Sequence, residues 1–207
     1  MIAVEVEQGS DEWHATRMGI PTASAADKIL TPGKIQPSTQ RGAYLNALLA
    51  EWATGESASN FQGNRDTERG NELEPEARAY FEFTTGLEAR KVGFVFRDEG
   101  RMSGCSPDGL VGDNSGYETK CPRPGTHVGY LLAGKVPTTY LAQIQFSMWI
   151  CGATSWWFQS YCPGLPALLV KVDRDSAWMV ALDKEIPKFV NDLLTGRARL
   201  KELGVVT

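Results

Sequence analysis

The chain has 207 residues, of which 42% are hydrophobic, and its formal net charge is −4 with a pI of about 5.3. This length and hydrophobic content predict one domain with a sizeable core over residues 1–207. The acidic balance argues against a uniformly basic nucleic-acid-binding protein, although a local patch or a bound metal can serve that purpose in an acidic chain. Four cysteines without paired spacing, no apolar run of about 18 residues and no N-terminal leader pattern predict a soluble, cytoplasmic protein.

The N-terminal quarter is predicted to hold a strand and three helices. Residues 1–7 alternate apolar and polar side chains, which predicts a short strand. Ser10, followed by two acids, is typical of a helix start, and Gly19 indicates where that helix ends. A second helix is expected over 23–30, and a third, with an apolar period, over 41–53.

Ser24, at the start of the second helix, admits two interpretations. It can cap the helix, which is the commoner role of a serine at this position. It can also contact a phosphate, because the free N–H groups and the dipole of a helix N-terminus bind anions. The polar segments 31–40 and 55–65 are expected to be loops, and the first is the better candidate for a mobile loop near a substrate.

A long helix is expected from Asp66 or Thr67 to about Thr84, with Glu74 beside its apolar stripe. Pro75 lies inside this segment and predicts either a kink or the start of a new helix. An acid that borders a core-facing stripe needs a partner or a metal. The alternative is that Glu74 is a solvated helix residue.

The most informative stretch runs from Ser103 to Cys121 and reads SGCSPDGLVGDNSGYETKC. If 117–121 is a strand, Glu118 and Lys120 project from one face, since side chains alternate along a strand. The glycines and polar residues before it predict a hairpin that brings Asp108 beside Glu118. Two carboxylates and one ammonium would then share a small surface. Hard cations such as Mg²⁺ bind one or two carboxylates together with water and phosphate.

Two other interpretations of this stretch stay open from spacing alone. Pro107, Asp108 and Gly109 also suit a plain β-turn, which would leave Glu118 and its lysine neighbour as an exposed pair. Cys105 and Cys121 flank the stretch, but without a second cysteine or histidine at ligand spacing they give little support to a zinc site.

The remaining elements follow from periodicity and turn residues. Strands are expected over 87–97, 155–161 and 168–173, helices over 138–151 and 176–203, and a loop with a short amphipathic segment over 123–137. Gly93 is a candidate bulge and Pro187 a candidate kink. Gln143 and Gln145 lie about 200° apart on their helix, so they cannot serve the same purpose. If Gln143 is buried, its amide needs core groups or a substrate as hydrogen-bond partners.

Short runs spread along the chain carry a resemblance to one family. They include Glu12-Trp13-His14, Thr22-Ala23-Ser24, Gly70 through Glu74, Cys105 through Gly109, Glu118 through Pro122 and Ala142 through Gln145. In these runs the chain resembles bacteriophage lambda exonuclease and its YqaJ-type viral recombinase relatives, within the PD-(D/E)xK nuclease superfamily. The runs follow the family's order over roughly residues 9–192, and their joint occurrence is more specific than any one of them.

The resemblance implies an α/β fold with a mixed central β-sheet flanked by helices, the PD-(D/E)xK core. It implies a Mg²⁺-dependent, processive 5′→3′ exonuclease on linear double-stranded DNA, which releases 5′-mononucleotides and leaves 3′ single-stranded overhangs. Two Mg²⁺ ions are expected, with Mn²⁺ as an alternative. The implied partners are double-stranded DNA ends, further copies of the chain in a homotrimer ring and a single-strand annealing protein, with no membrane.

The resemblance also assigns site residues by position. The implied catalytic residues are Asp108, Glu118, Lys120, Glu74 and Gln143, the implied metal ligands are Asp108, Glu118 and the Thr119 carbonyl, and the implied pocket for a 5′-phosphate consists of Arg17, Ser24 and Ser106. Lys120 is expected to orient or activate the attacking water. Two departures matter, because Pro75 directly follows Glu74 and because the loops 31–40 and 58–65, where duplex-parting residues are expected, do not align.

The same residues are compatible with two other functions. The alternative enzyme is a structure-specific or restriction-like endonuclease built on the same core. A third class is a non-enzymatic module whose active site has decayed and which binds DNA ends or proteins. The intact set of Asp108, Glu118 and Lys120 argues against this class.

Overall fold

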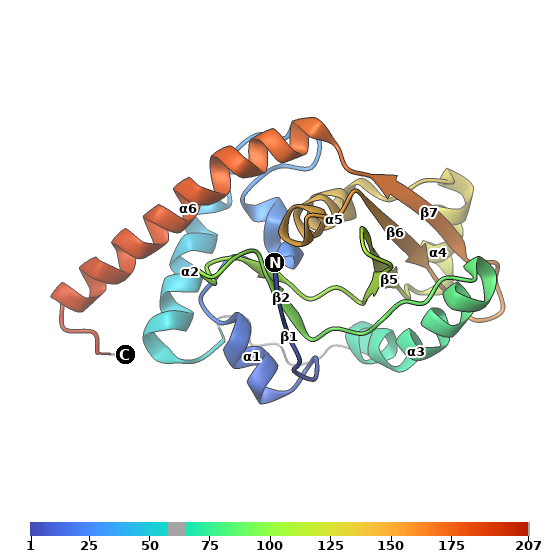
Figure 1. Cartoon of the computed structure of the whole chain (residues 1–207), viewed down its shortest axis with the longest axis horizontal. Helices are drawn as coiled ribbons and strands as arrows, with labels where there is room; N and C mark the ends of the chain where they lie inside the picture. The colour runs from blue at the N-terminus through green and yellow to red at the C-terminus, as the bar shows by residue number, and fades with distance from the viewer. Residues whose placement is uncertain (58–64, 207) are drawn as a thin grey trace.

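The computed structural model of the protein describes residues 1–57 and 65–206 (Figure 1). Its helices are α1 (Asp11–Arg17), the 3-10 helix η1 (Ala23–Lys28), α2 (Arg41–Thr54), α3 (Arg65–Thr85), α4 (Pro124–Ala133), α5 (Thr138–Cys151) and α6 (Ser176–Glu202). Its strands are β1 (Ile2–Val4), β2 (Phe94–Phe96), β3 (Gly104–Cys105), β4 (Gly109–Val111), β5 (Ser115–Lys120), β6 (Ser155–Ser160) and β7 (Leu168–Asp173). The loop predicted over 58–65 lies outside the described residues, apart from Arg65 at the start of α3.

The strands form two sheets, and the larger sheet is mixed. The antiparallel sheet β1-β2-β3 ties the N-terminal arm to the middle of the chain. In the sheet β4-β5-β6-β7, β5 and β6 are parallel and the other two pairs are antiparallel. The predicted fold class, a mixed sheet flanked by helices, is confirmed.

Helices pack on both faces of the mixed sheet because side chains alternate along its strands. Trp156 and Phe158 of β6 belong to the largest hydrophobic cluster, together with Ile144 of α5. Tyr117 of β5 belongs to a second cluster and packs on Phe81 of α3, with ring centroids 4.6 Å apart. Figure 1 shows α5 and α3 on either side of β5. Consecutive residues of β5 therefore face different helices.

α3 continues through Pro75 as a single helix. The proline nitrogen cannot donate a hydrogen bond to the carbonyl of Asn71, four residues earlier. Both residues are exposed, so water can bind that carbonyl instead. The predicted new helix start at Pro75 is therefore wrong, and Glu74 lies in the middle of α3. No helix among the described residues is both long and apolar enough to cross a lipid bilayer.

Two elements differ from the sequence prediction in the first half of the chain. The second helix is a 3-10 helix, which Ala25 interrupts with a non-helical φ of −119° and ψ of 18°. The strand predicted over 87–97 is reduced to β2, since Arg90 forms only an isolated bridge with Leu110. Gly93 precedes β2 and is not a bulge in it.

Two further elements differ in the second half. The region 123–137 holds the helix α4 where a loop with a short segment was expected, and a proline at the first helical position favours this start. β5 begins at Ser115, two residues earlier than predicted, and ends at Lys120. The helix predicted over 138–151 is confirmed, and the last two predicted strands form β6 and β7, which pair in antiparallel fashion.

Candidate active site

The β4–β5 hairpin brings the two acids of the central stretch together. Its register pairs Gly109 with Tyr117, so the residues just beyond that pair, Asp108 and Glu118, lie side by side. The carboxylate of Asp108 accepts a hydrogen bond from the backbone N–H of Thr119, with 2.6 Å between Oδ2 and N. The hairpin predicted from the glycine-rich turn is therefore confirmed.

Glu118 is the centre of the polar cluster and is only 2% exposed. Its Oε1 accepts a hydrogen bond from Lys120 Nζ at 2.6 Å and another from Gln143 Nε2 of α5, also at 2.6 Å. The expectation that Glu118 and Lys120 share a face is confirmed, and the alternative of an exposed pair is wrong. Gln145 instead bonds the backbone of Asp173 and Asp175, as expected from its different helix face.

Burial and neighbouring charges shift the pKa values of both Asp108 and Lys120. The pKa of Asp108 lies well above its ordinary value, because burial and the nearby carboxylates of Glu118 and Glu74 disfavour its charged form. Lys120 and the N–H of Thr119 oppose that shift without cancelling it. Burial lowers the pKa of Lys120, but attraction to Glu118 and Asp108 outweighs burial and raises it, so Lys120 remains an ammonium ion.

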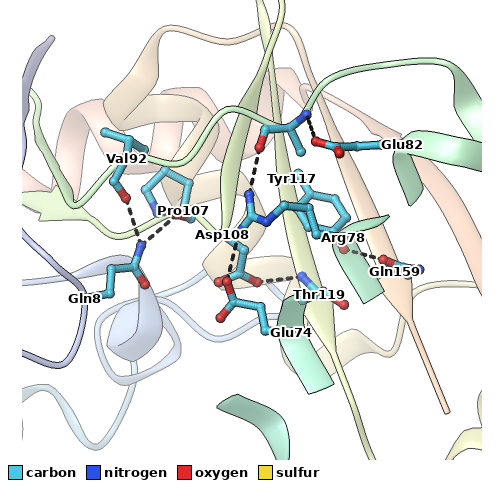
Figure 2. A network of polar contacts seen from close by, with 11 residues as sticks. Gln8, Glu74, Arg78, Glu82, Val92, Pro107, Asp108, Tyr117, Thr119 and Gln159 are labelled. Atoms are coloured by element: carbon cyan, nitrogen blue, oxygen red, sulfur yellow. Dashed lines mark hydrogen bonds and ion pairs between the residues drawn. The ribbon is translucent and has the colours of Figure 1, made fainter. Parts of the chain in front are cut away.

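Glu74 reaches this cluster from α3 (Figure 2). Its side chain is 27% exposed, and its Oε1 accepts a hydrogen bond from Arg78 at 2.8 Å, one helical turn later. The charge of Glu74 acts on Asp108. Glu74 is therefore not simply a solvated helix glutamate, because it pairs with Arg78 and lies at the carboxylate cluster.

The carboxylates of Asp108 and Glu118 could hold a divalent cation. Among the described residues, no three His, Cys, Asp or Glu side chains form a complete metal cage, which also leaves the zinc interpretation without support. Mg²⁺ needs only one or two carboxylates, because water and phosphate fill its remaining positions. Within the described part of the chain, hydrogen bonds reach only one oxygen of each of these carboxylates. This donor set fits a hard divalent cation, and the Thr119 carbonyl remains a predicted third ligand.

A second polar group lies at α1 and η1. Arg17 donates hydrogen bonds from Nη2 to Ser24 Oγ at 3.1 Å and to Thr22 Oγ1 at 3.4 Å. Its guanidinium lies 4.1 Å from the centroid of the Trp13 ring, and the indole N–H of Trp13 donates to Ser106 Oγ at 2.8 Å. Trp13 therefore links the three residues predicted to hold a phosphate.

The backbone explains how Ser24 and Ser106 come together. Thr22 forms a parallel bridge with Gly104, and the N–H of Gly104 donates to the carbonyl of Pro21 at 3.2 Å. Ser24 and Ser106 each follow two residues after that bridge. The segment that carries Ser106 continues directly into Asp108, so this polar group adjoins the carboxylate cluster.

Three residues of the site were not singled out for it from the sequence. Trp13 precedes Arg17 by four residues, which puts both side chains on one helix face, and this spacing is the signal that could have identified it. Arg78 stands four residues after Glu74, the spacing of a helical ion pair. Gln8 donates from Nε2 to the carbonyls of Val92 and Pro107, both at 2.9 Å, and nothing in its local sequence indicates this contact (Figure 2).

The fold and the site together define a class of protein. A mixed sheet carries an Asp on one strand of a hairpin and a Glu-x-Lys on the next, with a helix-borne glutamate and glutamine beside them. This is the arrangement of the PD-(D/E)xK nuclease fold. Residues 12–154 match the family described as YqaJ-like viral recombinase domain, and the chain belongs to this family.

Solved structures agree with that assignment. The alkaline exonuclease LHK-Exo from Laribacter hongkongensis is 32% identical and superposes with a TM-score of 0.82 over 93% of this chain and 97% of its own. The same exonuclease has been solved in complex with dAMP, with the same score. A phage-related exonuclease from Haemophilus somnus 129PT, 18% identical, shares the fold with a TM-score of 0.67 over 85% of this chain and 95% of its own.

One curated relative also matches part of the chain. The protein ExoD of Escherichia coli (strain K12) is 28% identical over 74 residues, which cover 34% of this chain and 82% of ExoD.

Proposed function

We propose that this protein is a Mg²⁺-dependent exonuclease that degrades one strand of linear double-stranded DNA from its 5′ end. The observation that carries the proposal is the cluster in which Lys120 and Gln143 both bond Glu118 while Asp108 lies alongside. Membership of the YqaJ-like family and the likeness to LHK-Exo, solved with dAMP, support a DNA substrate and mononucleotide products.

The side chains of the cluster divide the chemistry of phosphodiester hydrolysis. Asp108 and Glu118 would hold two metal ions, which act as Lewis acids and lower the pKa of bound water. Lys120 stays charged beside Glu118, so it can orient the attacking water and stabilise negative charge in the transition state. Gln143 fixes the Glu118 carboxylate from the side of α5.

The group around Arg17 accounts for the direction of digestion. A guanidinium can bind a terminal phosphate through two parallel hydrogen bonds, so Arg17 suits a 5′-phosphate better than a lysine would. Burial lowers the pKa of Arg17, but an arginine stays protonated in proteins. When the end is held there, the next bond lies at the carboxylates, and the new end then moves into the same pocket.

The proposal extends to the assembly and its partner. We infer a ring-shaped homotrimer that encloses duplex DNA and remains bound between cuts, and a single-strand annealing protein that receives the 3′ overhang. Family membership motivates both statements. Measurement of the mass in solution tests the trimer, and a monomeric mass at micromolar concentration would contradict it.

Digestion of labelled duplexes tests the activity. With Mg²⁺ present, linear duplex should release 5′-mononucleotides while covalently closed circular duplex stays intact. Cleavage of the closed circle would favour the alternative, a structure-specific or restriction-like endonuclease. Lys120→Ala should lower the rate by about a hundredfold or more and leave DNA binding in place, since positioned proton and charge donors contribute on that scale. A near-normal rate in this variant would remove the assigned role.

The preference for a 5′-phosphate tests the role of Arg17. Wild-type protein should degrade 5′-phosphorylated ends faster than 5′-hydroxyl ends. Arg17→Ala should reduce that ratio by about tenfold, the effect of losing a charged hydrogen bond, while slow digestion of hydroxyl ends continues. An unchanged ratio would show that the phosphate is bound elsewhere.

A further inference from the structure

Arg78 connects Glu74 to the backbone beside Asp108. It is 9% exposed, and it donates from Nη2 to Glu74 Oε1 at 2.8 Å and from Nη1 to the carbonyl of Ala89 at 2.7 Å. Its guanidinium also lies 6.0 Å from the centroid of the Tyr117 ring. A flat guanidinium with several donors can make these contacts at once, whereas the single ammonium of a lysine cannot.

The far end of this connection is itself fixed. The N–H of Ala89 donates to Glu82 of α3 at 2.9 Å, so two side chains of one helix hold both polar groups of Ala89 (Figure 2). The next residue, Arg90, exchanges two backbone hydrogen bonds of 2.9 Å with Leu110, which follows Asp108 by two residues. Arg78 therefore connects α3, which carries Glu74, to the segment around Ala89. That segment pairs with the strand that directly follows Asp108.

Glu74 depends on this arrangement for its position. It is held among the described residues only by Arg78, and it is partly exposed, so without the arginine its side chain is free to turn toward water. In its present position its carboxylate points toward that of Asp108 (Figure 2), near enough for the two charges to repel each other. A third carboxylate beside Asp108 adds negative charge around any cation that Asp108 and Glu118 hold.

We propose that Arg78 is a positioning residue that keeps the Glu74 carboxylate beside Asp108, and that this third carboxylate strengthens the binding of a divalent cation. The inference rests on the proposed function, because it assigns a role within the proposed metal site. Arg78 does not contact the cation or the substrate and acts through Glu74.

Arg97 provides a matched control. It also donates to a backbone carbonyl, that of Trp149, forms an ion pair at 3.6 Å with Asp183 and lies over an aromatic ring, 3.7 Å from the Trp149 centroid. These contacts tie β2 to α5 and α6. Arg97→Lys therefore removes the same types of contact without touching the carboxylate cluster.

The test is a double-mutant cycle on the full-length chain with Arg78→Lys, Glu74→Gln and both together. The first readout is the affinity for Mn²⁺ without DNA, measured by titration calorimetry. The second is the Mg²⁺ concentration for half-maximal nucleotide release. Arg78→Lys should weaken Mn²⁺ binding and raise the Mg²⁺ requirement about tenfold, as loss of an orienting partner of a metal ligand does. The double variant should differ from Glu74→Gln by less than twofold, and Arg97→Lys should match wild type.

Two results would overturn the inference. One is an unchanged Mn²⁺ affinity in Arg78→Lys, and the other is an equal loss with and without Glu74, which would indicate a packing role. If Arg78→Lys does not fold, Arg78→Gln, which can still bond the carboxylate or the carbonyl, takes its place in the cycle. A wild-type protein that binds Mn²⁺ but releases no nucleotide would refute the proposed nuclease function and still leave the calorimetric cycle to decide the role of Arg78.

Discussion

At the scale of single residues, the site places several acidic side chains close together, and their mutual repulsion disfavours the folded state. Asp108 lies near Glu118 and Glu74, and its pKa is raised because burial and these two neighbours disfavour its ionised form. A carboxyl whose folded-state pKa exceeds its unfolded value lowers the stability of the folded state at every pH above the unfolded pKa. That cost disappears as the pH falls through the raised pKa toward the ordinary value near 3.8. A bound cation would offset it at neutral pH.

Asp108→Asn tests this charge conflict. Asn retains an oxygen for the N–H of Thr119 but removes the negative charge, so the metal-free variant should be more stable than wild type at pH 8. A gain of about 1 kcal/mol corresponds to an increase in Tm of about 2–4 °C for a chain of this size. The gain should shrink toward pH 4, and nucleotide release should be lost. A lower Tm at pH 8, measured by calorimetry with chelator present, would contradict the prediction.

At the scale of elements, the N-terminal arm holds the segment that precedes the first acid. β1 pairs with β2, and the amide of Gln8 then joins the carbonyls of Val92 and Pro107. Gly93 allows this approach, because a side chain there would collide with the backbone of Val6. Since Pro107 immediately precedes Asp108, the arm fixes the backbone from which that carboxylate projects.

Gln8→Met tests the arm, because methionine keeps the length of the side chain but donates no hydrogen bond. Two lost hydrogen bonds should cost about 1–3 kcal/mol in the free energy of unfolding. We also expect nucleotide release to fall by about tenfold or more, since small displacements of catalytic groups have large effects on rate. Glu5→Met, at an exposed position of the same arm, is the control and should change neither quantity. Urea titrations measure the free energy of unfolding, and the digestion assay measures nucleotide release. Full activity in Gln8→Met would show that the hydrogen bonds of Gln8 do not position Asp108.

At the scale of the whole molecule, tyrosines with raised pKa values limit stability in alkaline solution. Burial raises the pKa of Tyr44 to about 12, above its ordinary value of 10.0. Burial likewise raises the pKa of Tyr140 to about 12, and for Tyr161 a hydrogen bond to Glu76 is the main cause of a pKa of about 12. A neutral group with a raised folded-state pKa contributes stability that is complete below its unfolded pKa and is lost as the pH rises toward the folded one.

The free energy of unfolding should therefore decrease between pH 10 and 12. Each such tyrosine contributes a slope of about 1.4 kcal/mol per pH unit in that interval. Tyr44→Phe removes one titrating group and should flatten the slope by about that amount, although it loses the acceptor for the N–H of Thr22 and starts from a lower stability. Denaturant titrations at pH 9, 10.5 and 11.5 measure the slope. An identical slope in wild type and Tyr44→Phe would contradict the prediction.

Local features of the sequence determined much of the helical framework and the identity of the central acids. Ser10 caps α1 as its position predicts, with its Oγ accepting from Trp13 N, and the apolar period predicts α5 over 138–151. These features depend on neighbours within one or two turns, which the sequence displays directly. The spacing of Asp108, Glu118 and Lys120, together with the family resemblance, was enough to indicate that they meet.

Tertiary structure decided which residues support that site and how far each strand extends. The strand expected over 87–97 shrank to β2 because a strand lasts only as long as a partner pairs with it, and its first residues find only one bridge. Gln8 reaches Pro107 across 99 positions, and Trp13 reaches Ser106 across 93. Arg78 meets Ala89 only because α3 packs beside that segment. Such contacts depend on the packing of elements distant in the chain, and no local pattern records which distant groups packing will bring together.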